Sequence, residues 1–305
     1  MRLLLTGASG FIGKNFLELA PKDIEIIGIY NSSKDIAGFI KEKNLSNVEL
    51  HKCDLTDKGR TKVLFENIGG NFEYCIFLAG NVNVSLSKSD PHRDMDITVG
   101  SLINVLQYCK INRLVYLSTT GVYDGLKGNV DASAKIDPKV PYCISKLMAE
   151  QYVKFYSSIG KIREFAILRF GGAFGKYSEK FMTKLVKDIY IKNKKSIDIY
   201  GDGTNIINVM YAKDAVKAML ACLKSRKSNM ICNLGQENMA ITEAVQLVAK
   251  IFSKKVDIKY IPKLEEQKYI TYNVDIDFNR IFNFKPDYSF EEGIKEFGEI
   301  MKNEG

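Results

Sequence analysis

The sequence predicts an α/β fold: a doubly wound parallel sheet of the Rossmann type, followed by a smaller C-terminal α/β lobe. Over the first 170 residues, short apolar segments bounded by turn residues alternate with segments of helical periodicity. Strands that are apolar on both faces and separated by helices are typical of a parallel sheet covered on both sides. After Gly171 the alternation becomes irregular, which indicates a lobe packed on the sheet domain.

The elements follow in chain order. The strand candidates of the sheet are residues 2–6, 24–30, 48–50, 74–78, 113–118 and 165–170. The helix candidates between them are residues 11–19, 58–67, 91–110 and 141–159, the last two opened by prolines. Beyond them we expect helices at residues 179–192 and 212–224, and strands at residues 197–200 and 230–234. Residues 1–170 would form a dinucleotide-binding domain to which residues 209–236 return, and residues 171–208 and 237–305 a substrate-binding lobe.

The composition is that of an ordinary globular chain, with 46% hydrophobic and 26% charged residues among 305. No apolar run approaches the roughly 18 residues of a membrane span, and no signal-peptide pattern follows the apolar start. The six cysteines form no CxxC pair, so we expect reduced core residues in a cytoplasmic protein. Two distant histidines argue against a metal site. Acidic residues are interspersed with the basic ones, so the net charge of +8 indicates a solvated basic surface rather than a nucleic-acid patch. It also suits anionic small substrates, but charge alone does not choose between these functions.

Three glycines, Gly7, Gly10 and Gly13, lie where the first strand ends and the first helix begins. A helix N-terminus presents unpaired N–H groups and the positive end of its dipole, so it attracts phosphate. A phosphate can approach the backbone closely only where side chains are absent, which favours glycine. The spacing GxxGxxG differs from the GxGxxG of the dehydrogenase fingerprint, and glycines at such turns also serve packing alone.

A second pattern joins Tyr142 and Lys146, which are four residues apart near the start of the helix at residues 141–159. This spacing places both side chains on one helix face. An ammonium group beside a phenol favours the phenolate, so we expect Lys146 to lower the pKa of Tyr142 and make it a proton carrier. An isolated pair of this kind is also common on ordinary helix surfaces. The hydroxyls of residues 118–120 favour a site, because they lie at the carboxyl edge of the sheet, where open α/β folds bind ligands.

Together these patterns resemble the extended short-chain dehydrogenase/reductases, specifically the NAD-dependent epimerase/dehydratase family of sugar-nucleotide enzymes. The resemblance covers nearly the whole chain. Besides the glycine turn, the STTGVY stretch and PYCISK, it includes CDLTD (53–57), LAG (78–80), LRFGGAFG (168–175), IYGDGT (199–204), VMYAKDA (209–215) and CNLGQ (232–236).

The resemblance implies roles for individual residues. Tyr142 would be the catalytic acid/base, Lys146 would bind the nicotinamide ribose and tune Tyr142, and Thr119 would hydrogen-bond the reacting hydroxyl or carbonyl. Asp54 and Leu55 would flank the adenine. With Tyr142 and Lys146, the dinucleotide would be held by Gly7, Ser9, Gly10, Phe11, Ile12, Gly13, Asp54, Leu55, Leu78, Ala79, Gly80 and Phe170.

The sequence also departs from the family pattern. Dehydratases of the family carry an acid just after the Thr, where this chain has Thr120 and Gly121, so dehydration is disfavoured. The second strand usually ends in an acid that binds the ribose 2′-hydroxyl of NAD. Here residues 31–34 offer Asn31, Ser32, Ser33 and Lys34, which could hold a 2′-phosphate, so we lean toward NADP over NAD. Gly172 and Ile207 replace a frequent Asn and Arg that contact the substrate.

Three functions remain open at this point. The first is an NAD(P)-dependent sugar-nucleotide epimerase that acts by transient hydride transfer through a keto sugar. The second is an NADPH-dependent reductase of a keto sugar or other carbonyl, and the third a regulatory protein that binds the dinucleotide without turnover. The Thr119, Tyr142 and Lys146 set counts against the third, and we favour the epimerase.

The family resemblance further implies a homodimer that buries the helices at residues 91–110 and 141–159. Apolar residues are spread along both helices and could face either a partner or the sheet: Ile103, Val105, Leu106, Leu147 and Val153.

Overall fold

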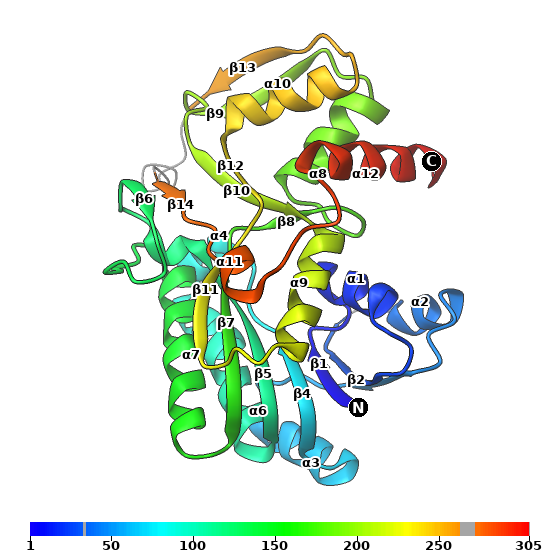
Figure 1. Ribbon diagram of the computed structural model, residues 1–305, viewed down its shortest axis with the longest axis vertical. Coiled ribbons are helices and arrows are strands. Elements are labelled where there is room, and N and C mark those ends of the chain that lie inside the picture. Colours follow the sequence, from blue (N-terminus) through cyan, green and yellow to red (C-terminus); the bar gives the residue numbers. More distant parts are fainter. Residues whose placement is uncertain (33–34, 263–271, 305) are drawn as a thin grey trace.

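The structure is a computed structural model and describes residues 1–32, 35–262 and 272–304. Its largest unit is a seven-stranded sheet with the strand order β11-β7-β5-β4-β1-β2-β3, in which every neighbouring pair is parallel (Figure 1). The strands are β1 (Arg2–Thr6), β2 (Glu25–Tyr30), β3 (Val48–Lys52), β4 (Asn71–Phe77), β5 (Lys110–Thr119), β7 (Ile162–Phe170) and β11 (Met230–Leu234). The predicted Rossmann-type fold is confirmed.

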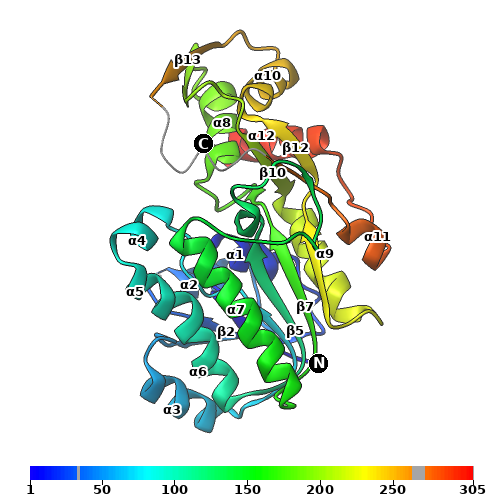
Figure 2. The same cartoon turned by 90° about the vertical axis from the view of Figure 1, so that its left-hand side faces the viewer.

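Helices cover both faces of this sheet. One face carries α1 (Phe11–Leu19), α2 (Ile36–Glu42) and α9 (Ala212–Lys224), and the other carries α3 (Lys58–Ile68), α6 (Ser101–Tyr108) and α7 (Pro141–Ser158) (Figures 1 and 2). Successive strand residues point to opposite faces. In β1, Leu3 and Leu5 therefore lie in the core on the α1 side, and Leu4 in the core on the α7 side. All three are fully buried, which explains the uninterrupted apolar run in the sequence.

Two of the predicted helices, at residues 91–110 and 179–192, have different boundaries from those expected. Residues 91–110 form α5 (Pro91–Met95), a π-helical turn (Asp96–Gly100) and α6, which ends at Tyr108. The backbone N–H of Lys110 instead donates to the carbonyl of Gly70, and that of Ile111 to Lys161, so these residues begin β5. Likewise, residues 179–192 contain α8 (Phe181–Val186) and a π-helical turn (Lys187–Ile191). The helices α2 and α4 (Val84–Ser89) were not predicted.

The C-terminal lobe lies above the carboxyl edge of the sheet (Figures 1 and 2). It contains a three-stranded sheet of β8 (Ala173–Phe174), β10 (Ile206–Tyr211) and β12 (Glu237–Ala240), and a pair of β9 (Ser196–Tyr200) with β13 (Asp257–Ile261). The helices α8, α10 (Ile241–Ile251) and α12 (Phe290–Glu304) pack around a core that includes Phe174, Val245 and Phe297.

Two features connect the lobe with the sheet domain. We expect residues 209–236 to return to the dinucleotide-binding domain. Of these residues, α9 packs on α1 and β11 joins the large sheet, whereas the end of β10 pairs with β8 in the small sheet of the lobe. The short strand β6 (Gly128–Val130) pairs with β14 (Tyr272–Val274) from late in the chain. Among the described residues, no helix combines the length and apolar character that crossing a membrane requires.

Candidate active site

A cavity of about 810 Å³ lies at the carboxyl ends of β1, β4 and β5, and residues of the lobe such as Met182 and Ile207 close its other side. The strand order reverses between β1 and β4, which is where doubly wound sheets bind dinucleotides. The side chain of Thr6 ties these two strand ends together: its Oγ1 accepts hydrogen bonds from the backbone N–H groups of Leu78 and Ala79, both at 3.1 Å.

The glycine turn between β1 and α1 has no room for side chains. Gly7 has φ +68°, and a Cβ there would lie 3.0 Å from the backbone nitrogen of Ala79. A Cβ on Gly13 would lie 2.3 Å from the carbonyl oxygen of Gly7. Gly10 is the N-cap of α1 and offers no side chain to the first N–H groups of this nine-residue helix. These donors line the cavity, so the turn fits a dinucleotide pyrophosphate.

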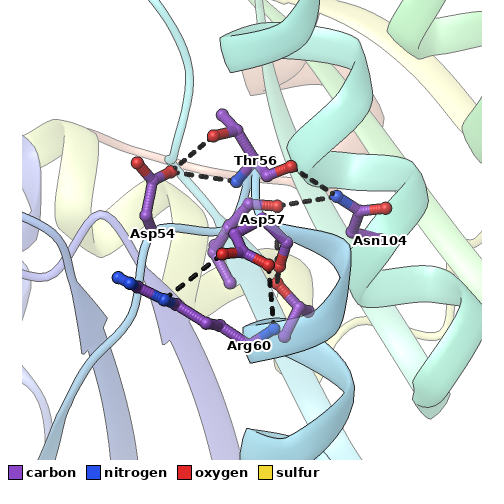
Figure 3. A network of polar contacts seen from close by, with 7 residues as sticks. Asp54, Thr56, Asp57, Arg60 and Asn104 are labelled. Carbon is purple, nitrogen blue, oxygen red and sulfur yellow. Dashed lines mark hydrogen bonds and ion pairs between the residues drawn. The ribbon is translucent and has the colours of Figure 1, made fainter.

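A polar network after β3 forms the part of the cavity that we expect to hold the adenosine (Figure 3). The carboxylate of Asp54 accepts hydrogen bonds from the backbone N–H and the hydroxyl of Thr56, at 3.0 and 2.7 Å. Burial alone would raise the pKa of Asp54, but the hydrogen bonds from Thr56 and Asn31 and the charge of Arg93 lower it. Asn104 on α6 donates to the carbonyls of Leu55 and Thr56 and so fixes this loop against the sheet domain.

The three predicted catalytic residues all line the cavity. Thr119 ends β5, and its side chain acts on Tyr142 of α7: burial raises the pKa of that phenol, and Thr119 lowers it in part. The ammonium group of Lys146, one turn further along α7, donates to the carbonyl of Leu117 at 3.1 Å. A Cβ on Gly80 would lie 3.4 Å from the same Lys146 nitrogen, so the absence of a side chain there lets the lysine approach the backbone of the β4 end.

The proton affinities of this group differ from the sequence-based expectation. Burial raises the pKa of the Tyr142 phenol, and the hydrogen bond with Thr119 offsets this only in part. Burial also lowers the pKa of Lys146 to about 8, against the opposing charges of Asp94 and Glu150. Desolvation therefore outweighs the predicted effect of the lysine on the phenol in the protein alone.

Buried polar groups hold α7 in place. Glu150 is fully buried and accepts hydrogen bonds from the hydroxyl of Ser118 at 2.6 Å and from Arg169 at 3.1 and 2.9 Å. The fully buried Asp94 accepts from Ser145 and from Asn81, both at 2.6 Å. Because each network joins α7 to a different part of the sheet domain, the helix has little freedom to move Tyr142 and Lys146.

The cavity brings together every predicted site residue that the structure describes. It is lined by Gly7, Ser9, Gly10, Phe11, Ile12, Gly13, Asn31, Ser32, Asp54, Leu55, Leu78, Ala79, Gly80, Thr119, Tyr142, Lys146 and Phe170. Ser33 and Lys34, which we expected at the 2′-phosphate, lie outside the described residues.

Sequence reasoning missed several residues that line the same cavity, among them Arg93, Asp124, Lys180 and Tyr272. Asp124 bears on the inference that dehydration is disfavoured because no acid follows Thr119. The sequence has no acid immediately after Thr119, yet a 3₁₀ turn at Thr120–Tyr123 brings the carboxyl group of Asp124 into the cavity. A second carboxyl group is therefore present at the site. The signal lay in the VYDG stretch, but only the fold shows that this acid turns inward.

The fold and the site together are those of an extended short-chain dehydrogenase/reductase. The family model described as "NAD dependent epimerase/dehydratase family" matches residues 3–235, and the chain belongs to this family of enzymes. The family that the sequence motifs predict is thereby confirmed.

Individual proteins of this kind are similar over the whole chain. A Methanocaldococcus jannaschii protein that carries the provisional name UDP-glucose 4-epimerase is 29% identical, covering 99% of this chain and 98% of its own. The UDP-N-acetylglucosamine 4-epimerase from Methanobrevibacter ruminantium, in complex with UDP-N-acetylmuramic acid, has a TM-score of 0.85 at 23% identity and covers 100% of this chain and 99% of its own. The UDP-glucuronic acid 4-epimerase from Bacillus cereus, in complex with UDP-glucuronic acid and NAD, has a TM-score of 0.85 at 22% identity and covers both chains fully.

Proposed function

We propose that this enzyme is a sugar-nucleotide epimerase that works with a bound NAD(P) and passes through a keto-sugar intermediate. The observation that carries this proposal is the placement of Thr119, Tyr142 and Lys146 in the same cavity as the glycine turn. A bound nicotinamide would supply the hydride acceptor and donor for this reaction. The three similar proteins reported above carry the names of sugar-nucleotide 4-epimerases, one of them provisionally, and these names support this choice.

The chain's own residues would move and hold the proton. Tyr142 removes the proton of the sugar hydroxyl as the carbon is oxidised, and gives it back when the carbonyl is reduced. Thr119, whose side chain lines the same cavity, would orient the same oxygen. Lys146 holds the ribose and, in its charged form, stabilises the phenolate. The pKa of Lys146 is lowered to about 8 by burial, so an anion beside it would favour its protonated form.

The substrate would be a nucleotide sugar whose diphosphate meets cations at the cavity mouth. Ile207 lines the cavity where the family often has an arginine, and cannot supply that charge. Lys180, which lines the cavity from the start of α8, can: its Nζ donates to the carbonyl of Val82 at 3.2 Å, across the opening between lobe and sheet domain. A charge-assisted contact from Lys180 would compensate for the missing arginine.

We keep NADP as the preferred cofactor. No carboxylate follows Tyr30 at the end of β2 within the described residues 31 and 32, so the strand end itself carries no group that repels a 2′-phosphate. Arg93 lines the cavity close enough to Asp54 to lower the pKa of its carboxyl group, and adds positive charge on this side. The opposing expectation comes from the Bacillus cereus epimerase, whose complex contains NAD.

A homodimer is proposed on a corrected set of residues. Val105, Leu106 and Val153 face the sheet and are fully buried, so they cannot contact a partner. The outward side of α7 instead carries exposed apolar residues: the exposed fractions of Ile144, Met148 and Phe155 are 43%, 37% and 52%, and that of Ile159, just past the end of the helix, is 55%. These residues recur at helical spacing, and such a stripe on a surface helix is typical of an association site.

The cell compartment is inferred from the cysteines. All six are buried and none forms a disulfide. This fits a reducing cytoplasm.

One experiment separates the epimerase from the reductase. The purified enzyme is denatured, the released nucleotide is identified by mass and absorbance, and the native enzyme is incubated with UDP-glucose. Interconversion of UDP-glucose and UDP-galactose at catalytic amounts of cofactor supports the epimerase. Stoichiometric consumption of added NADPH by keto sugars, with no interconversion, would assign the reductase instead.

A further inference from the structure

Asp124 is a carboxyl group in the cavity for which the proposed reaction has no role. It follows the 3₁₀ turn at Thr120–Tyr123, and its backbone N–H donates to the carbonyl of Gly121 at 3.1 Å, which closes the turn. Only 7% of the residue is exposed, and it lines the cavity. No lysine or arginine in the described part of the chain forms an ion pair with it. A buried acid without a cation is costly, so its partners matter.

The first oxygen of Asp124, Oδ1, is engaged by Tyr272 from the late strand β14. The hydroxyl of Tyr272 lies 3.0 Å from Oδ1 and 2.8 Å from the carbonyl oxygen of Thr120. A hydroxyl has one hydrogen, and the carbonyl can only accept. When Asp124 is ionised, the two acceptors share this hydrogen; when it is protonated, Asp124 can donate to Tyr272 while Tyr272 donates to Thr120. The site can hold Asp124 in either protonation state, and the protonated form gives both the Tyr272 hydroxyl and the Thr120 carbonyl a hydrogen bond of their own.

The second oxygen, Oδ2, faces the reacting groups. Its protein partner is the thiol of Cys143 at 3.8 Å, a weak donor. A Cβ built on Gly121 would lie 2.6 Å from the sulfur of Cys143, 3.3 Å from Oγ1 of Thr119 and 3.8 Å from Oδ2 of Asp124. These three side chains thus converge on one point beside Gly121. Oδ2 is left with capacity for a stronger donor than a thiol, a short distance from the catalytic threonine.

We propose that Asp124 determines the substrate class, by accepting a hydrogen bond from a hydroxyl of the sugar on Oδ2 and disfavouring sugars that carry a carboxylate. This inference rests on the proposed function, because it assumes that a nucleotide sugar occupies the cavity. A neutral sugar supplies the hydroxyl donor that Oδ2 lacks. A uronate would bring a second anion beside a carboxyl group that has no ion-pair partner among the described residues, and two neighbouring carboxylates cannot both stay ionised at low cost.

The pH dependence gives the discrimination a magnitude. Burial raises the pKa of Asp124 to about 6, against hydrogen bonds from Tyr272 and Cys143. A uronate that forces Asp124 to take up a proton loses affinity by about tenfold for each pH unit above that pKa, so by about tenfold at pH 7 and hardly at all at pH 5.

The other titratable groups at this end of the cavity do not change charge in this range. Burial raises the pKa of the Cys143 thiol and of the Tyr272 and Tyr142 phenols, and lowers that of Lys146 only to about 8. Neither histidine lines the cavity. A transition centred near pH 6 would therefore belong to Asp124.

The test is calorimetric titration of the cofactor-loaded enzyme with UDP-glucose and UDP-glucuronate at pH 5 and pH 7. The measured quantity is the ratio of the two Kd values, uronate over neutral sugar. In the parent enzyme this ratio should rise about tenfold from pH 5 to pH 7. Asp124→Asn keeps the size of the side chain and a partner for Tyr272, and should give a ratio that does not change with pH. Asp137→Asn, at an exposed acid that pairs with Lys139 and does not line the cavity, should behave like the parent.

A ratio independent of pH in the parent, or a pH-dependent ratio retained in Asp124→Asn, would overturn the inference. Equal weakening of both sugars by Asp124→Asn would show a structural role only and would also overturn it. Turnover of UDP-glucose, measured in parallel, keeps the two proposals apart. The expected Kd ratios without interconversion would leave the specificity role standing and reject the epimerase, whereas interconversion with a constant ratio would do the reverse.

Discussion

Replacing Glu150 by Gln should destabilise the enzyme strongly, although the two side chains have the same shape. Glu150 is fully buried, and Arg169 is only 4% exposed. The carboxylate accepts from Ser118 and Arg169 on Oε1 and from a second guanidinium nitrogen on Oε2. Glutamine keeps one acceptor oxygen but points an NH₂ group at the guanidinium, and leaves the Arg169 charge buried without a counter-ion.

The structure supplies a matched comparison for the magnitude. Breaking a buried pair on one side costs about 3–5 kcal/mol. The pair of Arg113 and Glu164 also joins neighbouring elements, but the Glu164 side chain is 33% exposed, and Arg113 additionally donates to the carbonyls of Cys222 and Ser225. Arg169 also keeps other acceptors, the hydroxyl of Tyr123 and the carbonyl of Ala132, so the two pairs differ mainly in exposure. Because water would reach Glu164, we expect Glu164→Gln to cost about 0–1 kcal/mol.

Thermal unfolding measures the difference. For domains somewhat smaller than this chain, Tm falls by about 2 °C or more for each kcal/mol lost in the free energy of unfolding. With the value of about 2 °C, Glu150→Gln should lower Tm by roughly 6–10 °C. Glu164→Gln should lower it by roughly 2 °C or less on the same scale. Equal shifts in the two variants, or a shift under about 2 °C for Glu150→Gln, would refute the argument that burial of the ion pair sets its contribution.

Three further outcomes are expected. Tyr142→Phe should lose about 10²–10⁴-fold in kcat while cofactor affinity is kept, and Cys143→Ala should lose little; near-native kcat in the Phe variant would reject the proposed acid/base. Lys34→Ala should weaken NADP binding several-fold in calorimetry and leave NAD unchanged. In the parent enzyme, one charge-assisted contact of about 1.5–3 kcal/mol should make NADP bind at least about tenfold more tightly than NAD. Equal affinities of the parent for NADP and NAD would make NAD the assigned cofactor. By light scattering the parent should be a dimer. Phe155→Arg on α7 should dissociate it, whereas Val63→Arg, at an equally exposed position on α3, should leave the dimer intact. A monomeric parent would reject the proposed dimer.

Most of the large sheet could be predicted from the sequence because its strands carry a strong local signal. Fully apolar runs such as residues 3–5 are buried on both faces. In a chain where such runs alternate with helices, this pattern indicates the strands of a parallel sheet. The helix ends were less predictable, because they depend on pairing with distant segments. The bond from Lys110 to Gly70 that begins β5 joins residues far apart in the chain and has no local signature.

In the candidate site, too, residues in local sequence patterns were predicted, and residues positioned by distant parts of the chain were missed. The glycine turn and the Tyr142–Lys146 spacing are local patterns, and both lie on the cavity where they were expected. Asp124 directly follows the STTGVY stretch and was still missed, because its direction is set by the 3₁₀ turn and by Tyr272, which reaches it across 148 positions of sequence. The effect of Lys146 on Tyr142 was also misjudged, because desolvation depends on everything that packs around α7.

The helix α7 shows why local patterns were informative about function here. Its cavity face carries Tyr142 and Lys146, and the same row continues one turn later with Glu150, which anchors the helix to Arg169. A different row, which includes Phe155, faces outward and is apolar. Because 3.6 residues make one turn, these rows stay separate along the 18 residues of the helix. A substitution on one row should therefore change one property alone: turnover, stability or association. Loss of turnover in a well-folded variant of the outward row would mean that association itself shapes the active site.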